Sequence, residues 1–413
     1  MTAVVSGEDR SDTRAVWLQV LAWAAAIAIA WAVLALVDFR TKDPDSALHV
    51  GIVMDLAGKP ARDWLAPEWG GRWDRAGLYR EHPPGLFILS MPLVAMGYPA
   101  AQAPLAVNAL FQILSLLFLQ QVARVFVARA DARAVGWLLQ LLPIAFVFRV
   151  RANHEQLVLC FYLAALVAVE KSRTRPAWIA VAALAAVATL SVKGVFVALL
   201  IASCGFWLIA RPAPAPRARL IAWGGIAVMT VVTLSAAAWF EASYLVLTHE
   251  SFFGPYLAQQ MGLAAMQRGD ALAAVIGQKL SNLAWYCGRM LWFAFPWGLV
   301  VFALLLPSVR RAWRWNAAMT RETVLLVGLA LLYVAMLSLS DRRADRYAFP
   351  SYYMVGLAGS VAALRSAPAL RRVSAAMARL YPFEQVVVWL VTFALTLPAL
   401  WNRFPKFKLI NNY

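Results

Sequence analysis

Long apolar stretches separated by short polar segments dominate the sequence from residue 15 onward. A helix needs about 20 mostly apolar residues, with a range of about 17–25, to cross a bilayer. Several stretches reach that length and others approach it, so the pattern predicts about 11 transmembrane helices. The stretch 86–98 follows Pro83-Pro84 and is expected to lie in the interface or to re-enter the membrane. The expected spans are 15–37, 103–123, 134–148, 156–169, 177–190, 194–210, 220–240, 288–307, 323–339, 349–364 and 385–401.

Composition supports the same class. Hydrophobic residues make up 62% of the 413 residues and charged residues only 14%, whereas soluble domains are about half apolar and a quarter charged. This excludes most soluble and disordered architectures and predicts an all-α polytopic membrane protein. We expect a tail at 1–14 and a single transmembrane domain at 15–413. The net charge of +17 does not indicate a nucleic-acid partner, since in membrane proteins the position of the charges matters more than their sum. The three cysteines have no disulfide or zinc spacing.

The loop charges predict the orientation. With the N-terminus in the cytoplasm, the inner segments carry 19 basic residues and seven acids, whereas the outer side carries 19 basic residues and fourteen acids. Short basic inner loops follow the positive-inside rule. The outer loops 38–85 and 241–287 are long for simple connections, and long loops are often functional. We therefore expect the chemistry on the outer side, with helices lying in the interface within the first outer loop.

Two acids open that loop. In Asp43-Pro44-Asp45-Ser46, Asp43 suits the N-cap of a helix that begins at the proline. Asp45 then lies in the first turn, one turn before His49, with its carboxylate free. Both acids would also complement the helix N-terminus. We interpret Asp45 as functional and leave Asp43 open between capping and function.

Two further outer segments combine acids with histidine. Glu81-His82 precedes the double proline, which would turn the chain back to the membrane surface. Asn153-His154-Glu155 directly precedes an apolar helix, where Asn153 suits an N-cap and Glu155 the first turn. Helix capping explains this segment about as well as function does, although charged groups at membrane depth usually have a partner or a substrate.

Cations complete the outer set. Lys193-Gly194 interrupts an apolar region where the chain turns, so Lys193 would either snorkel or hold a lipid phosphate. Near residues 341–350, Arg342, Arg343 and Arg346 lie outside despite the inner bias. Arginine suits bidentate phosphate contacts, whereas pairing with Asp341 and Asp345 would make them structural.

Taken in order, these motifs resemble those of the multispanning glycosyltransferases that use a polyprenyl-phosphate-linked sugar, the GT-C superfamily. This group includes protein O-mannosyltransferases and the lipid A aminoarabinose transferase. The resemblance covers most of residues 38–350, although Asp-Pro-Asp replaces the adjacent Asp-Glu common in those families. It rests on Asp43 and Asp45, on Glu81-His82-Pro83-Pro84, on Asn153-His154-Glu155, and on Lys193-Gly194 with Arg346-Tyr347-Ala348-Phe349-Pro350.

The resemblance implies a GT-C-like bundle in the bacterial inner membrane, with the N-terminus cytoplasmic and the active site periplasmic. The expected reaction is inverting transfer of a sugar from a polyprenyl-phosphate donor to a lipid or glycan acceptor of the cell envelope, such as lipopolysaccharide. Membrane lipids are expected as further partners, because the protein lies in the bilayer. No cofactor is required. The clustered acids leave a divalent cation open, but no His-rich ligand set accompanies them. The expected catalytic residues are Asp45, Asp43 and Glu155, and the expected substrate-binding residues are Glu81, His82, His154, Lys193, Arg343, Arg346 and Tyr347.

A transporter or flippase of a lipid-linked anionic sugar is the alternative, because it would explain the outer arginines equally well. It predicts an inverted internal repeat, and the loops 38–85 and 241–287 do not correspond in motif. No soluble domain follows the last expected helix, which favours a lipid or glycan acceptor over a protein. The sequence leaves the sugar and the acceptor open.

Overall fold

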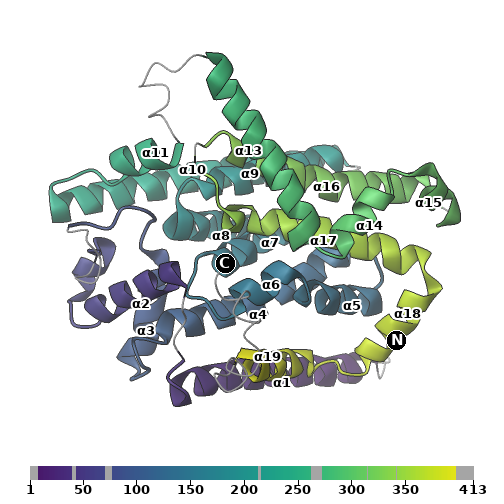
Figure 1. The fold of residues 1–413 in the computed structure, drawn as a ribbon, viewed down its shortest axis with the longest axis horizontal. Coiled ribbons are helices and arrows are strands. Elements are labelled where there is room, and N and C mark those ends of the chain that lie inside the picture. Colours follow the sequence, from purple (N-terminus) through teal and green to yellow (C-terminus); the bar gives the residue numbers. More distant parts are fainter. Residues whose placement is uncertain are drawn as a thin grey trace, which may run out of the picture.

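A computed structural model describes residues 8–39, 43–69, 77–212, 215–261, 272–313, 315–340 and 342–396. Within these ranges the secondary structure is helical, with loops between the helices and one isolated β-bridge between Glu68 and Leu78. The all-α prediction is confirmed. Figure 1 shows the helices stacked in layers. They are α1 (Glu8–Leu36), α2 (Pro44–Leu56), η1 (Ala61–Leu65), α3 (Gly85–Ala95), α4 (Ala103–Ala123), α5 (Arg129–Gln140), α6 (Pro143–Arg149), α7 (Glu155–Ser172), α8 (Trp178–Lys193), α9 (Phe196–Ala210), α10 (Pro216–Thr248), α11 (Phe253–Met261), α13 (Leu272–Phe293), α14 (Trp297–Ala303), α15 (Pro307–Ala312), α16 (Ala317–Ser338), η2 (Asp345–Ala348), α17 (Phe349–Ser366), α18 (Pro368–Ala378) and α19 (Glu384–Thr396).

The number of membrane spans is smaller than the predicted eleven if length and hydropathy decide. Among the described residues, four helices are long and apolar enough to cross a bilayer, or up to six if each of two bent pairs is one span. The four are α1, α4, α10 and α16. Each of the eleven expected segments contains helix, but α8, α9 and α19 are apolar and short. Helix α3, which covers most of the stretch 86–98 expected in the interface, is also apolar and short. The fold class is confirmed and the count of eleven is not.

Two of the expected spans are not continuous helices. The segment 134–148 consists of parts of α5 and α6, and the chain bends by 68° between these helices. The segment 288–307 includes α14 and the end of α13, and the chain bends by 113° between them. Pro143 begins α6, and Pro296 immediately precedes α14. Proline has no N–H to donate and clashes with the preceding turn, so each helix ends and the chain turns.

The predicted outer loop 241–287 is largely helical. Helix α10 continues to Thr248, and its 33 residues span about 50 Å at 1.5 Å per residue, well beyond the roughly 30 Å hydrocarbon core. Glu241 holds the turn that follows α10, because it accepts hydrogen bonds from the Ser251 hydroxyl and from the Phe252 and Phe253 amides. Residues 262–271 lie outside the described ranges, as do 1–7 of the expected tail and Asp341.

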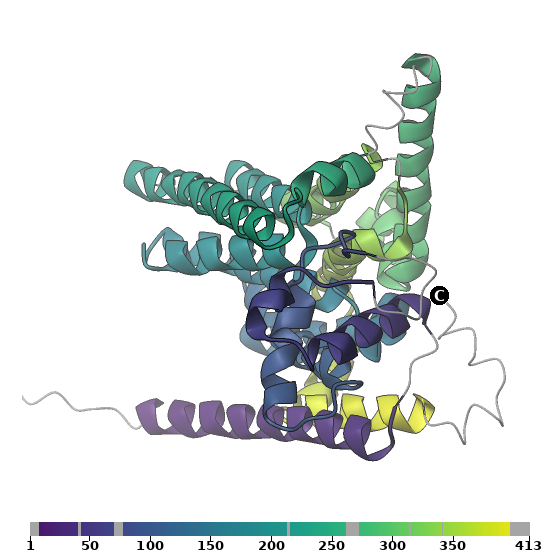
Figure 2. The same ribbon diagram turned by 90° about the vertical axis from the view of Figure 1, so that its left-hand side faces the viewer.

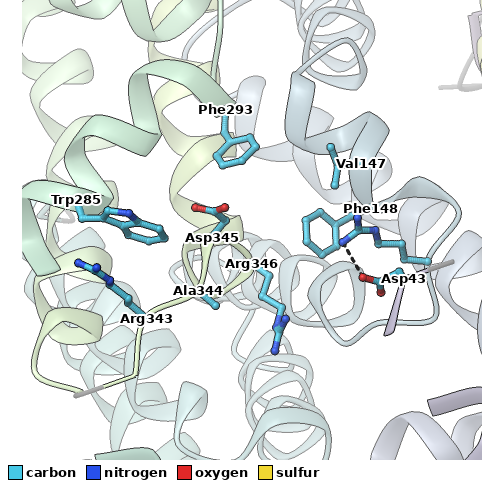
Figure 3. A pocket seen from close by; sticks show the side chains of 10 residues that line it. Asp43, Val147, Phe148, Trp285, Phe293, Arg343, Ala344, Asp345 and Arg346 are labelled. Carbon is cyan, nitrogen blue, oxygen red and sulfur yellow. Dashed lines mark ion pairs between the residues drawn. The ribbon is translucent and has the colours of Figure 1, made fainter. Parts of the chain in front are cut away.

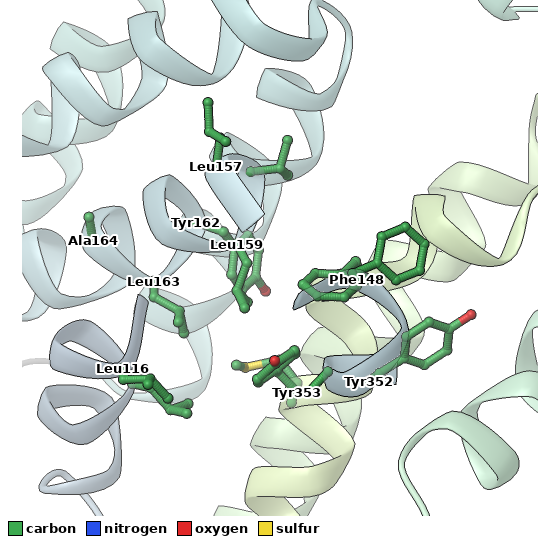
Figure 4. Packing of buried hydrophobic residues seen from close by; sticks show 14 of the residues in the cluster. Leu116, Phe148, Leu157, Leu159, Tyr162, Leu163, Ala164, Tyr352 and Tyr353 are labelled. Carbon is green, nitrogen blue, oxygen red and sulfur yellow. The ribbon is translucent and has the colours of Figure 1, made fainter. Parts of the chain in front are cut away.

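The core is built around α7, which packs against α4, α8 and α9. Figure 4 shows the buried side chains of α4 and α7, such as Leu116 and Leu163, near the tyrosines of α17. Small residues let helices approach closely in a membrane, and α8 buries Ala182, Ala183, Ala185 and Ala186. Both ribbon views show α1 beside α19 and α13 rising clear of the other helices (Figures 1 and 2).

Candidate active site

Four segments that are far apart in the sequence bring charged side chains together. Asp45 lies in the first turn of α2, Glu155 begins α7, Lys193 ends α8, and Arg346 lies in η2. Arg346 Nη1 pairs with Asp45 Oδ2, and Lys193 Nζ lies 2.5 Å from Glu155 Oε1. The four residues form what we call the charged cluster. These predicted site residues therefore converge on one region.

The two acids of the first turn have different surroundings. Asp43 caps α2 as predicted, because its carboxylate accepts hydrogen bonds from the Ser46 amide at 3.0 Å and the Ser46 hydroxyl at 2.6 Å. It also pairs with Arg151 at 3.2 Å, and its side chain is only 8% exposed. The Asp45 side chain is 35% exposed. Asp43 is thus held by the fold, whereas the Asp45 carboxylate, which pairs with Arg346, is partly exposed.

The ion pair of Glu155 with Lys193 is fully buried, since each side chain is 1% exposed. Lys193 therefore does not snorkel. Its ammonium lies over the rings of Phe196 and Tyr347, 4.6 and 4.8 Å from their centroids. The predicted cap at Asn153 is wrong by one residue, because His154 is the N-cap and Asn153 accepts from the His154 amide instead.

Two glycines fix the chain around Lys193. Gly194 has φ +49°, and a Cβ there would meet the Tyr256 hydroxyl at 2.2 Å. That hydroxyl accepts from the Val195 amide and donates to the Lys193 carbonyl, both at 3.0 Å. A Cβ on Gly85 would meet the Ser191 carbonyl oxygen at 2.5 Å, so the start of α3 lies directly against the end of α8. This contact brings the Glu81-His82 segment to the Lys193 turn.

Three buried histidines lie beside the charged cluster. The ring of His154 is 4.6 Å from that of His49 and 4.7 Å from that of His82, centroid to centroid. His49 Nδ1 lies 2.6 Å from the Ala152 carbonyl oxygen and donates to it. Burial lowers the pKa of His49, and it lowers the pKa values of His82 and His154 well below the ordinary range, reinforced by Lys193. We call these residues the histidine cluster; all three imidazoles are neutral near pH 7.

His49 and Arg151 are site residues that the sequence prediction missed. His49 stands four residues after Asp45, so both lie on one face of α2, and this spacing was the available signal. Arg151 is buried against Asp43, yet its sequence neighbours Arg149 and Asn153 gave no indication of that partner. Only the packing of α2 against the segment before α7 reveals it.

The remaining predicted residues take structural and surface positions. The Glu81 carboxylate lies 3.7 Å from Arg342 Nη2, and the Glu81 carbonyl accepts from Gln260. Arg343 is exposed and lies 5.5 Å above the ring of Trp285. Glu81 thus links the first outer loop to other elements, while Arg343 lies against the aromatic ring of Trp285 in α13.

Electrostatics in η2 favour a retained positive charge. Burial lowers the pKa of Arg346, but the carboxylates of Asp45 and Glu155 outweigh this and raise it above the ordinary value. Burial also raises the pKa of Asp345, against the opposing effect of Arg289, whose Nε lies 3.1 Å away. Within the described part of the chain, no three His, Cys, Asp or Glu side chains are arranged to hold a metal ion.

Two cavities adjoin η2. The first, the apolar cavity, has a volume of about 660 Å³, and Gly194, Phe196 and Tyr347 line it near Lys193. The second, the arginine cavity, has a volume of about 290 Å³, and Arg151, Arg343 and Arg346 line it with Asp43, Asp345 and aromatic side chains. Figure 3 shows Trp285 and Arg343 on one side of the arginine cavity and Phe148 and Asp43 on the other. The consecutive residues Arg346 and Tyr347 therefore face different cavities.

Comparison with known proteins identifies the fold. No protein-family model matches the sequence, and no curated protein matches it. The structure is similar to that of ArnT from Cupriavidus metallidurans in the apo state, with a TM-score of 0.59 and 17% identity over 86% of this chain and 61% of that chain. The same ArnT bound to undecaprenyl phosphate gives a TM-score of 0.59 and 17% identity over 87% and 63%. The chain thus spans about three fifths of the length of ArnT, and it has an ArnT-like fold, in agreement with the family resemblance of the sequence motifs.

Proposed function

We propose that this polytopic membrane protein is a glycosyltransferase that moves a sugar from a polyprenyl-phosphate carrier to a lipid or glycan acceptor of the cell envelope. The observation that carries the proposal is the charged cluster beside the apolar cavity, assembled from α2, α7, α8 and η2. The similarity in fold to ArnT, which has been solved with undecaprenyl phosphate bound, supports a polyprenyl-phosphate donor.

The donor would lie across the boundary between the apolar cavity and the charged cluster. A volume of about 660 Å³ falls within the range of about 300–1,000 Å³ that is typical of ligand pockets, and the lining is largely aliphatic and aromatic. The polyprenyl chain would enter this cavity, and its phosphate would meet Lys193 and Arg346. Tyr347 would contact the donor where the two regions join. Arg346 has several N–H donors, so it can hold Asp45 and a phosphate oxygen together.

The proposed chemistry is a single displacement at the anomeric carbon. Asp45 takes the proton of the acceptor hydroxyl, and the hydroxyl oxygen forms a bond to the anomeric carbon. The bond from that carbon to the phosphate oxygen breaks, and its electron pair leaves with the polyprenyl phosphate, whose charge Lys193 and Arg346 stabilise. Attack opposite the leaving group inverts the anomeric centre. Glu155 positions Lys193, Asp43 positions the start of α2, and His82 and His154 form the neutral wall beside the reacting groups.

The proposed location is the bacterial inner membrane, with the N-terminus in the cytoplasm and the site on the periplasmic side. The distribution of basic residues among the loops supports this orientation. The charged cluster is then at the outer rim of the bilayer, where a lipid-linked sugar and an envelope acceptor can both reach it.

The test is turnover by the purified protein in nanodiscs with a panel of radiolabelled polyprenyl-phosphate sugars and envelope lipids. Wild type should release free polyprenyl phosphate, and Asp45→Asn should lower the rate by roughly 10²–10⁴-fold, the usual contribution of a general base. Asp55→Asn is the matched control, since Asp55 lies on the same helix but pairs with Lys59 at 2.9 Å. Unchanged release of polyprenyl phosphate by Asp45→Asn would exclude this residue as the base. Transport of the lipid-linked sugar across the membrane without its cleavage would exclude a glycosyltransferase.

A further inference from the structure

The arginine cavity is a second polar site, which shares Arg346 with the proposed donor site but otherwise has a lining of its own. It lies between α6, α13, η2 and the start of α2, and Val147, Phe148, Trp285 and Phe293 form its apolar wall. Tyr347 lines the apolar cavity but not this one, and Lys193 lines neither. The two cavities therefore present separate surfaces on either side of η2.

The charges of the arginine cavity do not cancel. Three arginines line it against two carboxylates, Asp43 and Asp345. Asp345 already has Arg289 at 3.1 Å, and Arg346 has Asp45 as its own partner. Of the other two arginines, Arg151 pairs with Asp43, whose carboxylate also accepts hydrogen bonds from Ser46. The other is Arg343. The cavity therefore carries an excess of positive charge.

Arg151 has hydrogen-bonding groups left over in a buried position. Its side chain is only 4% exposed, and Nη1 lies 3.2 Å from Asp43. Its Nε and Nη2 are buried without a hydrogen-bond partner in the structure. Buried donors are nearly always satisfied, and an unsatisfied one costs free energy. A buried guanidinium with two unpaired nitrogens at a cavity wall indicates an anion as the missing partner.

Arg343 and Trp285 complete the recognition surface. The guanidinium of Arg343 lies over the ring of Trp285 at 5.5 Å, and Arg343 is exposed. Stacking on an aromatic ring holds a guanidinium in place while its edge stays free for a phosphate or carboxylate. The cavity thus offers one buried and one exposed arginine, with an aromatic wall that suits a sugar ring.

We propose that the arginine cavity binds an anionic group, a phosphate or a carboxylate, on the sugar headgroup of the acceptor. Arg151 and Arg343 hold the anion, and Trp285 packs against the sugar ring that carries it. This inference rests on the proposed function, because it assigns the acceptor to the cavity that adjoins Arg346 opposite the donor. Arg346 lines the arginine cavity and pairs with Asp45. An acceptor bound in this cavity would therefore have its hydroxyl near Asp45.

The test measures binding, so that it does not depend on turnover. The probes are mannose 6-phosphate, glucuronate and the uncharged methyl glucoside, each titrated against the protein in nanodiscs of neutral lipid. Wild type should bind at least one of the two anionic sugars saturably and at least tenfold more tightly than the uncharged sugar. Arg343→Gln should weaken that binding roughly ten- to a hundredfold, the usual effect of losing a charge-assisted hydrogen bond. Preference between the two anionic probes separates a phosphate from a carboxylate.

Two controls keep the outcome decisive. Arg62→Gln removes an arginine whose side chain is 79% exposed and lies outside the cavity, and it should leave binding unchanged. Saturation with polyprenyl phosphate should also leave sugar binding intact, because the donor occupies the other cavity. No saturable binding by wild type, equal binding of charged and uncharged sugars, or displacement by polyprenyl phosphate would each overturn the proposal. Absence of donor cleavage, with anionic binding retained, would instead count against the proposed transferase.

Discussion

Removing the charge of Lys193 should separate its structural role from its role in the reaction. In Lys193→Met the flexible apolar side chain replaces most of the lysine stem, but the Glu155 carboxylate stays buried at 1% exposure without its partner. Its second oxygen, Oε2, has no hydrogen-bond partner even with Lys193 present. Breaking a buried ion pair costs about 3–5 kcal/mol, a factor of roughly 10²–10⁴ in the folding equilibrium constant. We expect Lys193→Met to be strongly destabilised.

The double variant Lys193→Met/Glu155→Gln removes both charges together. Replacing a buried pair with neutral groups of similar volume is often close to neutral in stability, so the double variant should recover most of the lost stability. Unfolding by SDS titration in mixed micelles measures this. Lys59→Met is the matched control, because Lys59 makes an exposed pair with Glu68 at 3.1 Å, and exposed pairs contribute only about 0–1 kcal/mol.

Turnover of the double variant then tests the phosphate role. If Lys193 stabilises the departing lipid phosphate, the refolded double variant should remain at least about 100-fold slower than wild type, as expected for a lost electrostatic contact in the transition state. Full recovery of turnover with stability would show that the pair is structural and would refute the phosphate role. A single Lys193→Met variant as stable as wild type would refute the reasoning about the buried pair.

Three further outcomes follow from the geometry of the site. Gly194→Ala forces a Cβ onto the Tyr256 hydroxyl at φ +49° and should destabilise the fold by about 1–3 kcal/mol in the same SDS titration, whereas Gly51→Ala, with open space around it, should not. The three histidines of the histidine cluster have lowered pKa values in the folded state, so the unfolded chain takes up more protons as the pH falls through about 6.5. The free energy of unfolding should therefore be at its full value above that pH and decrease toward pH 5.5, with a smaller decrease in His154→Asn. A free energy of unfolding that does not change with pH would contradict this. EDTA should leave turnover unchanged, because Lys193 and Arg346 supply the positive charge for the phosphate; loss of activity that Mg²⁺ or Mn²⁺ restores would contradict that assignment.

The sequence predicted the parts of this structure that local chemistry determines. Asp43 before Pro44 gave the start of α2 correctly, because capping depends on neighbouring residues. The apolar stretches predicted the helices, and the family resemblance of the outer charged motifs predicted the fold. The sequence did not predict the breaks after α5 and α13, although a proline lies at each, since apolar composition continues across both.

The partners of the site side chains depend on packing, and local patterns do not contain them. Lys193 was expected to snorkel or bind phosphate, yet it is buried against Glu155 because α8 lies directly beside α7. Arg343 and Arg346 are three residues apart, and only the short helix η2 assigns Arg346 to Asp45 and leaves Arg343 over Trp285. Arg151 has a partner 108 positions earlier in the chain, Asp43, which no spacing rule links to it.

The most direct test of the central claim is an experimental structure of the protein with polyprenyl phosphate bound in nanodiscs. We predict that the phosphate lies within ion-pair distance, about 4 Å, of both Lys193 and Arg346, and that the polyprenyl chain fills the apolar cavity lined by Phe196 and Tyr347. A lipid bound elsewhere, with the pairs of Lys193 with Glu155 and Arg346 with Asp45 untouched by it, would contradict the claim that these side chains form one site.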